Sequence, residues 1–192
     1  MSRAVLDPAA YRLRTASTAE LDADDLVEIR ALMDVAFGDD PEERFEDEDW
    51  AHALGGLHVI FEVDGRIVGH AAVVERRLEI GRRPVRTGYV EAVAVLPEYH
   101  GRGLGSAIME VVDAHIRATY ELGALGTGRH AFYERLGWRT WRGPAFVRTA
   151  DGERRTPDEE GYILVLPTPS TPIEPLDRGA SISCEERPGD DW

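Results

Sequence analysis

A glycine-rich stretch, EYHGRGLGSAIM at residues 98–109, constrains the fold more than any other part of the chain. An apolar run precedes its three glycines, and apolar residues at helical spacing follow them. Main-chain N–H groups in such a loop can face an anion, and a helix N-terminus adds about half a positive charge. The stretch matches neither the G-x-x-x-x-G-K-S/T nor the G-x-G-x-x-G phosphate loop. We therefore expect a strand–loop–helix unit that binds an anionic group through its backbone.

Composition excludes several classes of protein. With 192 residues, 43% of them hydrophobic, the chain suits one globular domain. Its first residues lack the apolar core of a signal peptide, no apolar run reaches membrane-spanning length, and Cys184 is the single cysteine, so we expect a cytoplasmic protein. The net charge of −14 argues against nucleic-acid binding. It fits either simple solubility or a cationic ligand.

Periodicity predicts an α/β (α+β) fold with a mixed, mostly antiparallel sheet. The fourth and fifth strands, around residues 85–97 and 123–125, should be parallel, because a helix starting at residue 104 connects them. We expect one domain over residues 1–192, with residues 1–10 loose and residues 168–192 a Pro-rich tail. The other expected strands are 11–17, 58–63, 66–80, 138–141 and one at the end of 156–167, and the other helices are 21–37, 49–56 and 128–137.

The stretch VAVLPEYHGRGLGSAIM resembles the acyl-CoA loop of the GNAT acetyltransferase superfamily, roughly strand–V-x-P-x-x-Q/R-x-x-G-x-G/A–helix. His100 stands where Gln or Arg is usual. From about residue 12 onward, the segments RTGYVEAVAV, YELGAL, YERLGW, TPDEEG and GDDW resemble aminoglycoside 2′-N-acetyltransferases. Two departures are a longer acidic loop and Glu159 where Asp is usual. The resemblance implies acetyl transfer from acetyl-CoA to the 2′-amine, which attacks the thioester directly in a ternary complex. It also implies resistance to aminoglycoside antibiotics and a possible homodimer.

The resemblance also assigns the residues that bind acetyl-CoA. The main chain of the fourth strand would pair with the pantetheine arm and its thioester carbonyl, and the glycine loop would bind the pyrophosphate. Together these residues are Val93, Ala94, Val95, His100, Gly101, Arg102, Gly103, Leu104, Gly105 and Ser106.

Two residues carry the chemistry that the resemblance implies. Glu91 lies in the strand that enters the loop, between apolar neighbours, where a carboxylate is unusual. It would be the general base, acting through water. Tyr133 would give a proton to the leaving thiolate. Residue types alone allow an alternative for each residue. Glu91 could form a structural salt bridge with Arg86, and Tyr133 could be a core aromatic.

An aminoglycoside is a polycation, so carboxylates are its natural partners. By motif, its contacts would be Asp40, Asp49, Glu91, Asp158 and Glu159, with backbone at Ala92 and Gly126. We further expect Trp192 to dock beside the acceptor with its terminal carboxylate facing an ammonium group. The alternatives are a solvated surface for each acid, a helix N-cap for Asp49, and a tail packed elsewhere or in a dimer interface.

The histidines are too scattered for a metal site, and we expect no metal cofactor. His52, His58, His70, His115 and His130 are interpreted as structural or surface residues. Two other functions stay open: acetylation of another polyamine or amino sugar, and a non-catalytic acyl-CoA-binding sensor of polycations. The retention of both Glu91 and Tyr133 argues against the sensor.

Overall fold

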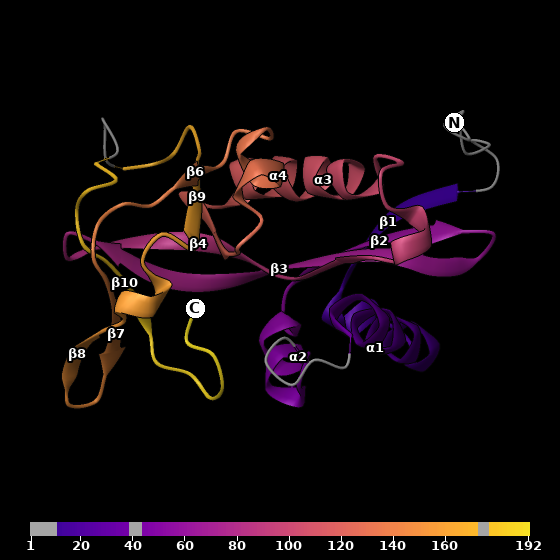
Figure 1. Cartoon of the computed structure of the whole chain (residues 1–192), viewed down its shortest axis with the longest axis horizontal. Helices are drawn as coiled ribbons and strands as arrows, with labels where there is room; N and C mark the ends of the chain where they lie inside the picture. Colours follow the sequence, from indigo (N-terminus) through magenta and orange to yellow (C-terminus); the bar gives the residue numbers. More distant parts are fainter. Residues whose placement is uncertain (1–10, 39–43, 173–176) are drawn as a thin grey trace. The chain divides into compact units, whose positions relative to one another are not determined.

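The computed structural model of the chain describes residues 11–38, 44–172 and 177–192 (Figure 1). The described residues form the helices α1 (Ala23–Phe37), α2 (Asp47–Ala53), α3 (Leu104–Thr119) and α4 (His130–Glu134), and the strands β1 (Tyr11–Ser17), β2 (Leu57–Val63), β3 (Arg66–Ile80), β4 (Arg83–Val95), β5 (Leu122–Gly126), β6 (Arg139–Thr140), β7 (Ala145–Thr149), β8 (Gly152–Arg155), β9 (Ile163–Pro167) and β10 (Ile182–Glu185). They divide into two compact units. The first unit contains residues up to 74 and residues 90–112, and the second contains residues 75–89 and 113–192. The single domain that we expected stays a prediction.

The first unit is built on an antiparallel arrangement of β1, β2 and the first half of β3, in which Tyr11 pairs with Val63 and Leu57 with Val73. Helix α1 begins at the N-cap Asp22, whose carboxylate accepts the N–H of Asp25. Helices α1 and α2 lie on one face of these strands, and α3 begins on the other (Figure 1). The burial of Ile29, Leu32 and Met33 holds α1 to the sheet. The strand at 11–17 and the helix within 21–37 are thereby confirmed.

The second unit contains the parallel pair predicted from the sequence. Residues Thr87–Tyr89 of β4 run parallel to Leu122–Ala124 of β5, which is antiparallel to β9. At the other edge, β10 lies between the end of β3 and β7, and it is parallel to β7. The hairpin of β7 and β8 and the strand β10 were not predicted. The tail therefore contributes a strand to the sheet, where we expected only an extended segment.

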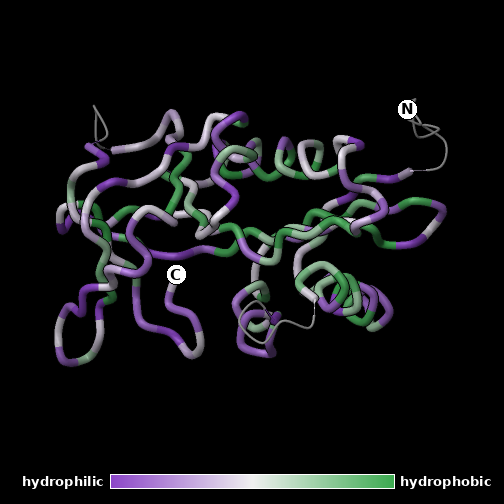
Figure 2. Tube along the Cα trace, in the orientation of Figure 1, coloured by the Kyte–Doolittle hydropathy of each residue, from purple (hydrophilic) through white to green (hydrophobic). Residues whose placement is uncertain are grey.

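The apolar residues gather in the strands at the centre of each unit, as the green segments of Figure 2 show. In the second unit, Trp138 is buried and donates its indole N–H to Asp113 at 3.0 Å. Gly88 has to be a glycine here, because a Cβ would lie 2.6 Å from the Tyr120 ring. This absence of a side chain lets α3 pack directly on β4. Among the described helices, none is long and apolar enough to cross a membrane.

Candidate functional site

The last part of β4 exposes the residues that the sequence placed on one face. Glu91, Val93 and Val95 are partly exposed, whereas the residues between them are buried. This alternation follows from the period of two in a strand. Arg86, the alternative partner of Glu91, instead donates Nε–H to Glu75 at 2.9 Å. Glu91 therefore lies on the partly exposed face of β4.

Ala92 interrupts the regular strand directly after Glu91. Its φ of 50° lies in the left-handed region, which is rare and strained for a residue with a Cβ. The carbonyl oxygen of Ala92 accepts a hydrogen bond from Nδ1 of the buried His70 at 2.8 Å. A left-handed residue inside a strand forms a bulge, which frees main-chain groups from the ladder. The β4 backbone beside Glu91 thus has groups to offer to a ligand.

The glycine loop connects β4 to α3 through a single turn at Pro97–Tyr99. Gly101 and Gly103 have φ angles of 74° and 91°, and a Cβ at either position would meet no atom within 4 Å. These glycines are therefore needed for their conformation and not for space. Helix α3 has 16 residues, and its first N–H groups, which have no partner within the helix, can face an anion.

Two side chains complete this loop. His100 donates its Nε2–H to the carbonyl oxygen of Val95 at 2.8 Å, so the imidazole ties the loop to the strand before it. The Arg102 guanidinium lies over the Tyr99 ring, 5.1 Å from its centroid. It is exposed and is the cation nearest the helix start in sequence. The chemistry of the loop fits the pyrophosphate of CoA, which Gly101 to Ser106 would hold.

Tyr133 lies in α4 of the second unit and is 6% exposed. Its ring makes edge contacts with Phe132 and Trp138. Burial raises the pKa of the Tyr133 phenol to about 12, so the hydroxyl keeps its proton at neutral pH. The residue is a core aromatic whose hydroxyl carries a proton. Its role as the proton donor to the thiolate stays a prediction.

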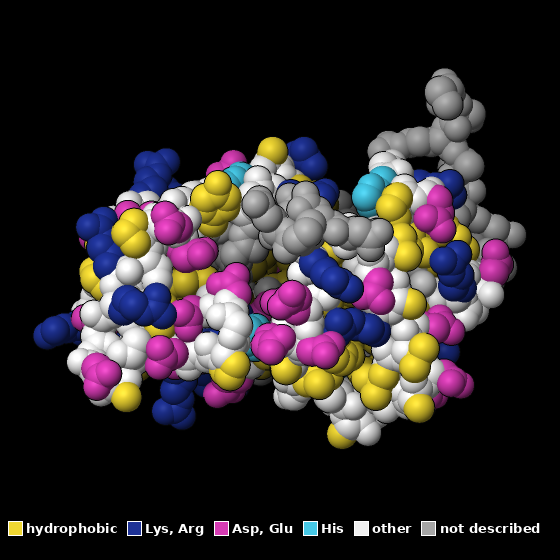
Figure 3. Space-filling model, turned by 60° about the horizontal axis from the view of Figure 1, so that its bottom comes forward, with side chains coloured by type: hydrophobic (Ala, Val, Ile, Leu, Met, Phe, Trp, Pro, Cys, Tyr) yellow, Lys and Arg dark blue, Asp and Glu magenta, His cyan; other side chains and the backbone are white. Residues whose placement is uncertain are grey.

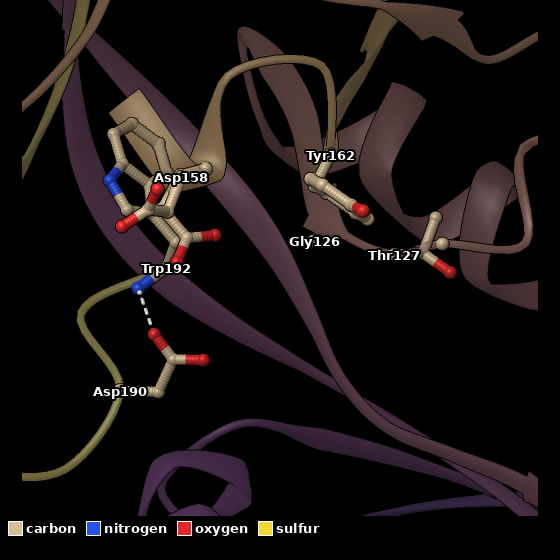
Figure 4. Close-up of a pocket in the computed structure, with 8 residues that line it drawn as sticks. Gly126, Thr127, Asp158, Tyr162, Asp190 and Trp192 are labelled. Atoms are coloured by element: carbon tan, nitrogen blue, oxygen red, sulfur yellow. Dashed lines mark hydrogen bonds between the residues drawn. The ribbon is translucent and has the colours of Figure 1, made fainter. Parts of the chain in front are cut away.

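A pocket of about 310 Å³ lies in the second unit. It brings together four residues that the sequence assigned to the acceptor, Gly126, Asp158, Glu159 and Trp192. Figure 4 shows Asp190 and Trp192 on one side of it and Tyr162 and Thr127 on the other. Its other lining residues were missed by the sequence reasoning: Thr127, Gly128, Tyr162 and Asp190. Asp190 belongs to the segment GDDW that supported the resemblance, which is the signal that would have found it.

Two hydrogen bonds connect the loops around this pocket. The N–H of Thr127 donates to the carbonyl oxygen of Tyr162 at 2.9 Å. His130, at the start of α4, donates Nε2–H to the carbonyl of Gly161 at 2.6 Å. The loop after β5 and the loop before β9 therefore have a fixed spacing, which sets the width of the pocket.

The tail closes the pocket from its other side. Trp192 is 5% exposed, and its indole N–H donates to Thr156 Oγ1 at 3.1 Å. Its main-chain N–H donates to Asp190 Oδ1 at 3.1 Å, the contact dashed in Figure 4. Arg187 donates to the main-chain oxygen of Trp192 at 3.3 Å. A terminal tryptophan is costly to leave in solvent, which favours this buried position. A contact between Trp192 and the acceptor stays a prediction.

Arg76 holds the tail from the core of the second unit. Its guanidinium is 4% exposed and donates to the main-chain oxygens of Asp191, at 2.8 Å, and Glu185, at 3.0 Å. It also pairs with the Glu185 carboxylate at 3.1 Å and lies over the Tyr89 ring, 4.8 Å from its centroid. The flat guanidinium suits this arrangement, because it presents several donors in one plane. Arg76 is a further residue that the sequence reasoning missed.

The pocket has a strongly negative electrostatic character. Burial raises the pKa of Glu159, and the neighbouring charges of Asp190, Asp158 and Asp191 raise it further. Acidic side chains also cover much of the face shown in Figure 3, where every dark blue side chain is Arg because the chain has no Lys. A carboxylate that is costly to ionise beside other carboxylates favours a cationic ligand.

Two acids predicted for the acceptor are not among these residues. Asp40 lies outside the described residues. Asp49 belongs to the first unit, where its carboxylate accepts the N–H of Glu46 at 2.8 Å. Glu46 is the N-cap of α2 and Asp49 stands three residues later, in a capping box. The alternative that made Asp49 the N-cap was therefore wrong, because Glu46 holds that position. Asp49 nevertheless stabilises the start of α2. Its contact with an acceptor stays a prediction.

The chain matches known acetyltransferases. Residues 17–141 match a family model described as an acetyltransferase (GNAT) domain. Over 184 residues, the chain is 40% identical to the aminoglycoside 2′-N-acetyltransferase of Mycolicibacterium fortuitum, covering 95% of this chain and 92% of that protein.

Solved structures share the fold. The GNAT family N-acetyltransferase YhbS from Escherichia coli, in complex with CoA, matches with a TM-score of 0.66 at 18% identity, over 93% of this chain and 92% of that one. A GCN5-related N-acetyltransferase from Kribbella flavida matches with a TM-score of 0.57 at 23% identity. This second match covers 71% of the chain and only 35% of that protein, so the chain spans about a third of its length.

Proposed function

Because the chain belongs to the aminoglycoside 2′-N-acetyltransferase family of GNAT acetyltransferases, we propose that it transfers an acetyl group from acetyl-CoA to the 2′-amine of an aminoglycoside. The observation that carries the proposal is the pocket of the second unit, where Asp158, Glu159 and Asp190 gather with Trp192. Aminoglycosides combine several ammonium groups with many hydroxyls. The carboxylates match the former, and the hydroxyls of Thr127 and Tyr162 match the latter.

Acyl transfer to an amine requires a deprotonated nucleophile, a positioned carbonyl and a proton for the leaving group. Glu91 would accept the proton of the 2′-ammonium through a water molecule. The free amine then forms the C–N bond as the C–S bond of the thioester breaks. Main-chain groups of Val93 to Val95 would hold the thioester and its pantetheine arm. The same main-chain donors would stabilise the negative charge that develops on the carbonyl oxygen.

Tyr133 would supply the proton that the thiolate takes up, and the proton that the nitrogen loses as the amide forms would restore the phenol. Burial raises the pKa of the phenol to about 12, so at neutral pH the hydroxyl holds the proton that an acid must give. Acetylation removes a positive charge from the antibiotic, so the proposed consequence for the cell is aminoglycoside resistance.

A matched pair of acceptors tests the proposal. We would compare two aminoglycosides that differ only in carrying an amine or a hydroxyl at the 2′ carbon, and follow thiol release from acetyl-CoA with a colorimetric thiol reagent. The 2′-amine should be acetylated, and NMR of the product should place the acetyl group on that nitrogen. The 2′-hydroxyl compound should bind and release no thiol.

Two other functions make different predictions in the same assay. An enzyme for another amine would release thiol with spermidine or glucosamine and not with the 2′-amine antibiotic. A polycation sensor would bind acetyl-CoA and release thiol with none of these compounds. Equal acetylation of both members of the matched pair would contradict the 2′ assignment, while leaving acetyltransferase activity in place.

A further inference from the structure

A chain of hydrogen bonds through two buried histidines ends on the strand residue next to Glu91. Thr18 Oγ1 contacts His58 Nε2 at 2.8 Å, and His58 Nδ1 contacts His70 Nε2 at 2.9 Å. His70 Nδ1 then contacts the carbonyl oxygen of Ala92 at 2.8 Å. Both histidines have no exposed surface, and all these residues belong to the first unit. Neither ring has a role in the proposed proton transfers.

The end of this chain fixes the position of every proton in it. A carbonyl oxygen only accepts, so His70 must carry its proton on Nδ1. Its Nε2 is then an acceptor when the ring is neutral, which requires the proton of His58 on Nδ1. His58 Nε2 in turn accepts the hydroxyl proton of Thr18. The alternative acceptor for that proton, the carbonyl of Gly56, is 3.4 Å away and is a poorer match.

The other end of the chain is anchored on the backbone as well. The hydroxyl oxygen of Thr18 accepts the main-chain N–H of Gly55 at 2.8 Å. The hydrogen bonds therefore run in one direction, from the turn before β2 to the bulge of β4, and each imidazole nitrogen has one partner. Such a fully satisfied buried network allows a single arrangement of its members.

The surroundings keep both imidazoles neutral. Burial lowers the pKa of His58 to about 4 and that of His70 to about 3. Trp50 lies near both rings, with centroid distances of 6.2 Å to His58 and 6.3 Å to His70. The network therefore keeps its directed arrangement over the pH range in which an enzyme of this kind works.

We propose that His70, oriented by His58 and Thr18, is a positioning residue for acetyl transfer, which holds the left-handed peptide of Ala92 so that the main chain after Glu91 meets the thioester. The inference rests on the proposed function. Ala92 has no conformational preference for a φ of 50°, so something must hold it there. The hydrogen bond from His70 to its carbonyl is the contact that does so. Loss of that bond should let the peptide turn over and the strand straighten.

The proton arrangement can be tested without any activity. Long-range ¹H–¹⁵N correlation spectra of ¹⁵N-labelled protein at pH 7 distinguish the two neutral tautomers of histidine from the cation. We expect His58 and His70 both neutral and protonated on Nδ1. A proton on Nε2 of His70, or a charged ring at either position, would overturn the proposal.

A matched pair of variants separates positioning from simple packing. His70→Asn keeps an N–H donor near the place of Nδ1, whereas His70→Leu keeps apolar volume and loses the donor. We expect His70→Leu to lower kcat by about 10- to 100-fold, the cost of a small misplacement at a reacting centre, with the KM for the acceptor within about threefold. His70→Asn should recover most of kcat. An equal loss in both variants, or no loss in either, would contradict the proposal.

Binding of the acyl donor gives a readout that does not depend on the acceptor. CoA lacks the acyl carbonyl that the bulge is proposed to meet, so calorimetry can compare it with acetyl-CoA. His70→Leu should weaken acetyl-CoA several-fold, roughly the value of one hydrogen bond, and leave CoA nearly unchanged. An equal effect on both ligands would reject positioning, even if the protein acetylated a different amine.

A variant one step away covers the case in which His70→Leu does not fold. His58→Phe keeps a ring and removes the group that donates to His70 Nε2. It should give a smaller loss of kcat in the same direction, while His70 stays protonated on Nδ1, because the Ala92 carbonyl still accepts that proton. A wild-type kcat in His58→Phe would show that His58 does not orient His70.

Discussion

The strand and glycine loop of the first unit and the acidic pocket of the second are proposed to bind opposite charges by opposite means. The loop would use neutral main-chain groups that are consecutive in the sequence, from Val93 to Ser106. The pocket would use carboxylates from separate segments of the chain, at residues 158–159 and 190, beside the loop at 126–128. A backbone site needs a local conformation, whereas a side-chain site needs the assembled sheet and tail. The two regions should therefore respond differently to mutation, salt and pH.

The largest expected effect comes from Glu91, which lies on β4 beside the main-chain groups proposed to bind the acyl donor. Glu91→Gln keeps the shape of the side chain and removes the base. We expect turnover to fall by roughly two to four orders of magnitude, the usual contribution of a positioned general base, with melting temperature nearly unchanged. Steady-state kinetics between pH 6 and 9 would measure it.

Glu98→Gln is the matched control, because Glu98 lies in the same unit and makes an exposed ion pair with Arg66, at 3.5 Å. It should leave turnover unchanged. Turnover of Glu91→Gln within about threefold of the wild type would remove Glu91 from the role of base.

Removal of residues 190–192 should disable the pocket alone. The KM for the aminoglycoside should rise by about an order of magnitude or more, because a charge-assisted hydrogen bond and the Trp192 wall are lost. Binding of acetyl-CoA should stay within about twofold, since the loop belongs to the other unit. Asp190→Asn should give part of this effect, and Asp151→Asn, in the exposed turn between β7 and β8, should give none. A parallel loss of CoA affinity would contradict a separate pocket.

Arg76→Lys sharpens the comparison by leaving the pocket residues intact. A lysine ammonium cannot donate to Asp191, Glu185 and the Glu185 carboxylate in one plane, so the tail should loosen. We expect the aminoglycoside KM to rise by roughly three- to tenfold, with little change in kcat, because the reacting groups stay in place. Limited proteolysis should cut the tail of this variant faster. Wild-type kinetics together with faster cleavage would show that the order of the tail does not affect aminoglycoside binding.

Salt should distinguish the two regions in the unmodified protein. Between 50 and 500 mM salt, we expect affinity for the aminoglycoside to fall more steeply than affinity for CoA, since screening weakens pairs of full charges at an open site most. Calorimetric titrations of both ligands over this range, about a threefold change in Debye length, would give the two slopes. Equal slopes would mean that the carboxylates do not carry acceptor binding.

The smallest effect concerns stability. The pKa of Glu159 is raised in the folded state, so the fold favours its protonated form, and the stability that this form contributes is lost as pH rises from 4.5 through the raised pKa. At neutral pH the fold therefore bears the cost of an ionised Glu159. Glu159→Gln should remove this cost and raise the melting temperature at pH 7. The rise should be only about 1–3 °C, because solvent screens a half-buried group. It should be smaller at pH 4, where less of Glu159 is ionised.

The same variant should weaken aminoglycoside binding, so that stability and affinity change in opposite directions. Scanning calorimetry at the two pH values, with Asp151→Asn as the control for surface charge, would measure this. A melting temperature that falls at pH 7 would show that Glu159 has a favourable partner and not only like charges around it.

Family, parallel strands and anion loop could be predicted because they depend on short stretches of sequence. The glycines at 101 and 103 need positive φ angles, and the helix after them follows an apolar repeat, so EYHGRGLGSAIM specifies its own conformation. The parallel pairing of β4 and β5 follows from the crossover helix between them. The membership in the GNAT acetyltransferases is confirmed by the family model and the 40% identical relative.

The sequence by itself determined the loop, the order of most strands and the acidic residues available for a cationic ligand. Only the tertiary structure decided which of those acids share a pocket, because carboxylates from residues 158 and 190 meet only after β10 has entered the sheet beside β3 and β7. It also decided that Asp49 completes a capping box and that His70, hydrogen-bonded to His58, contacts the Ala92 carbonyl. Local conformation follows from neighbouring residues, whereas the partners of a buried or converging side chain depend on residues far along the chain.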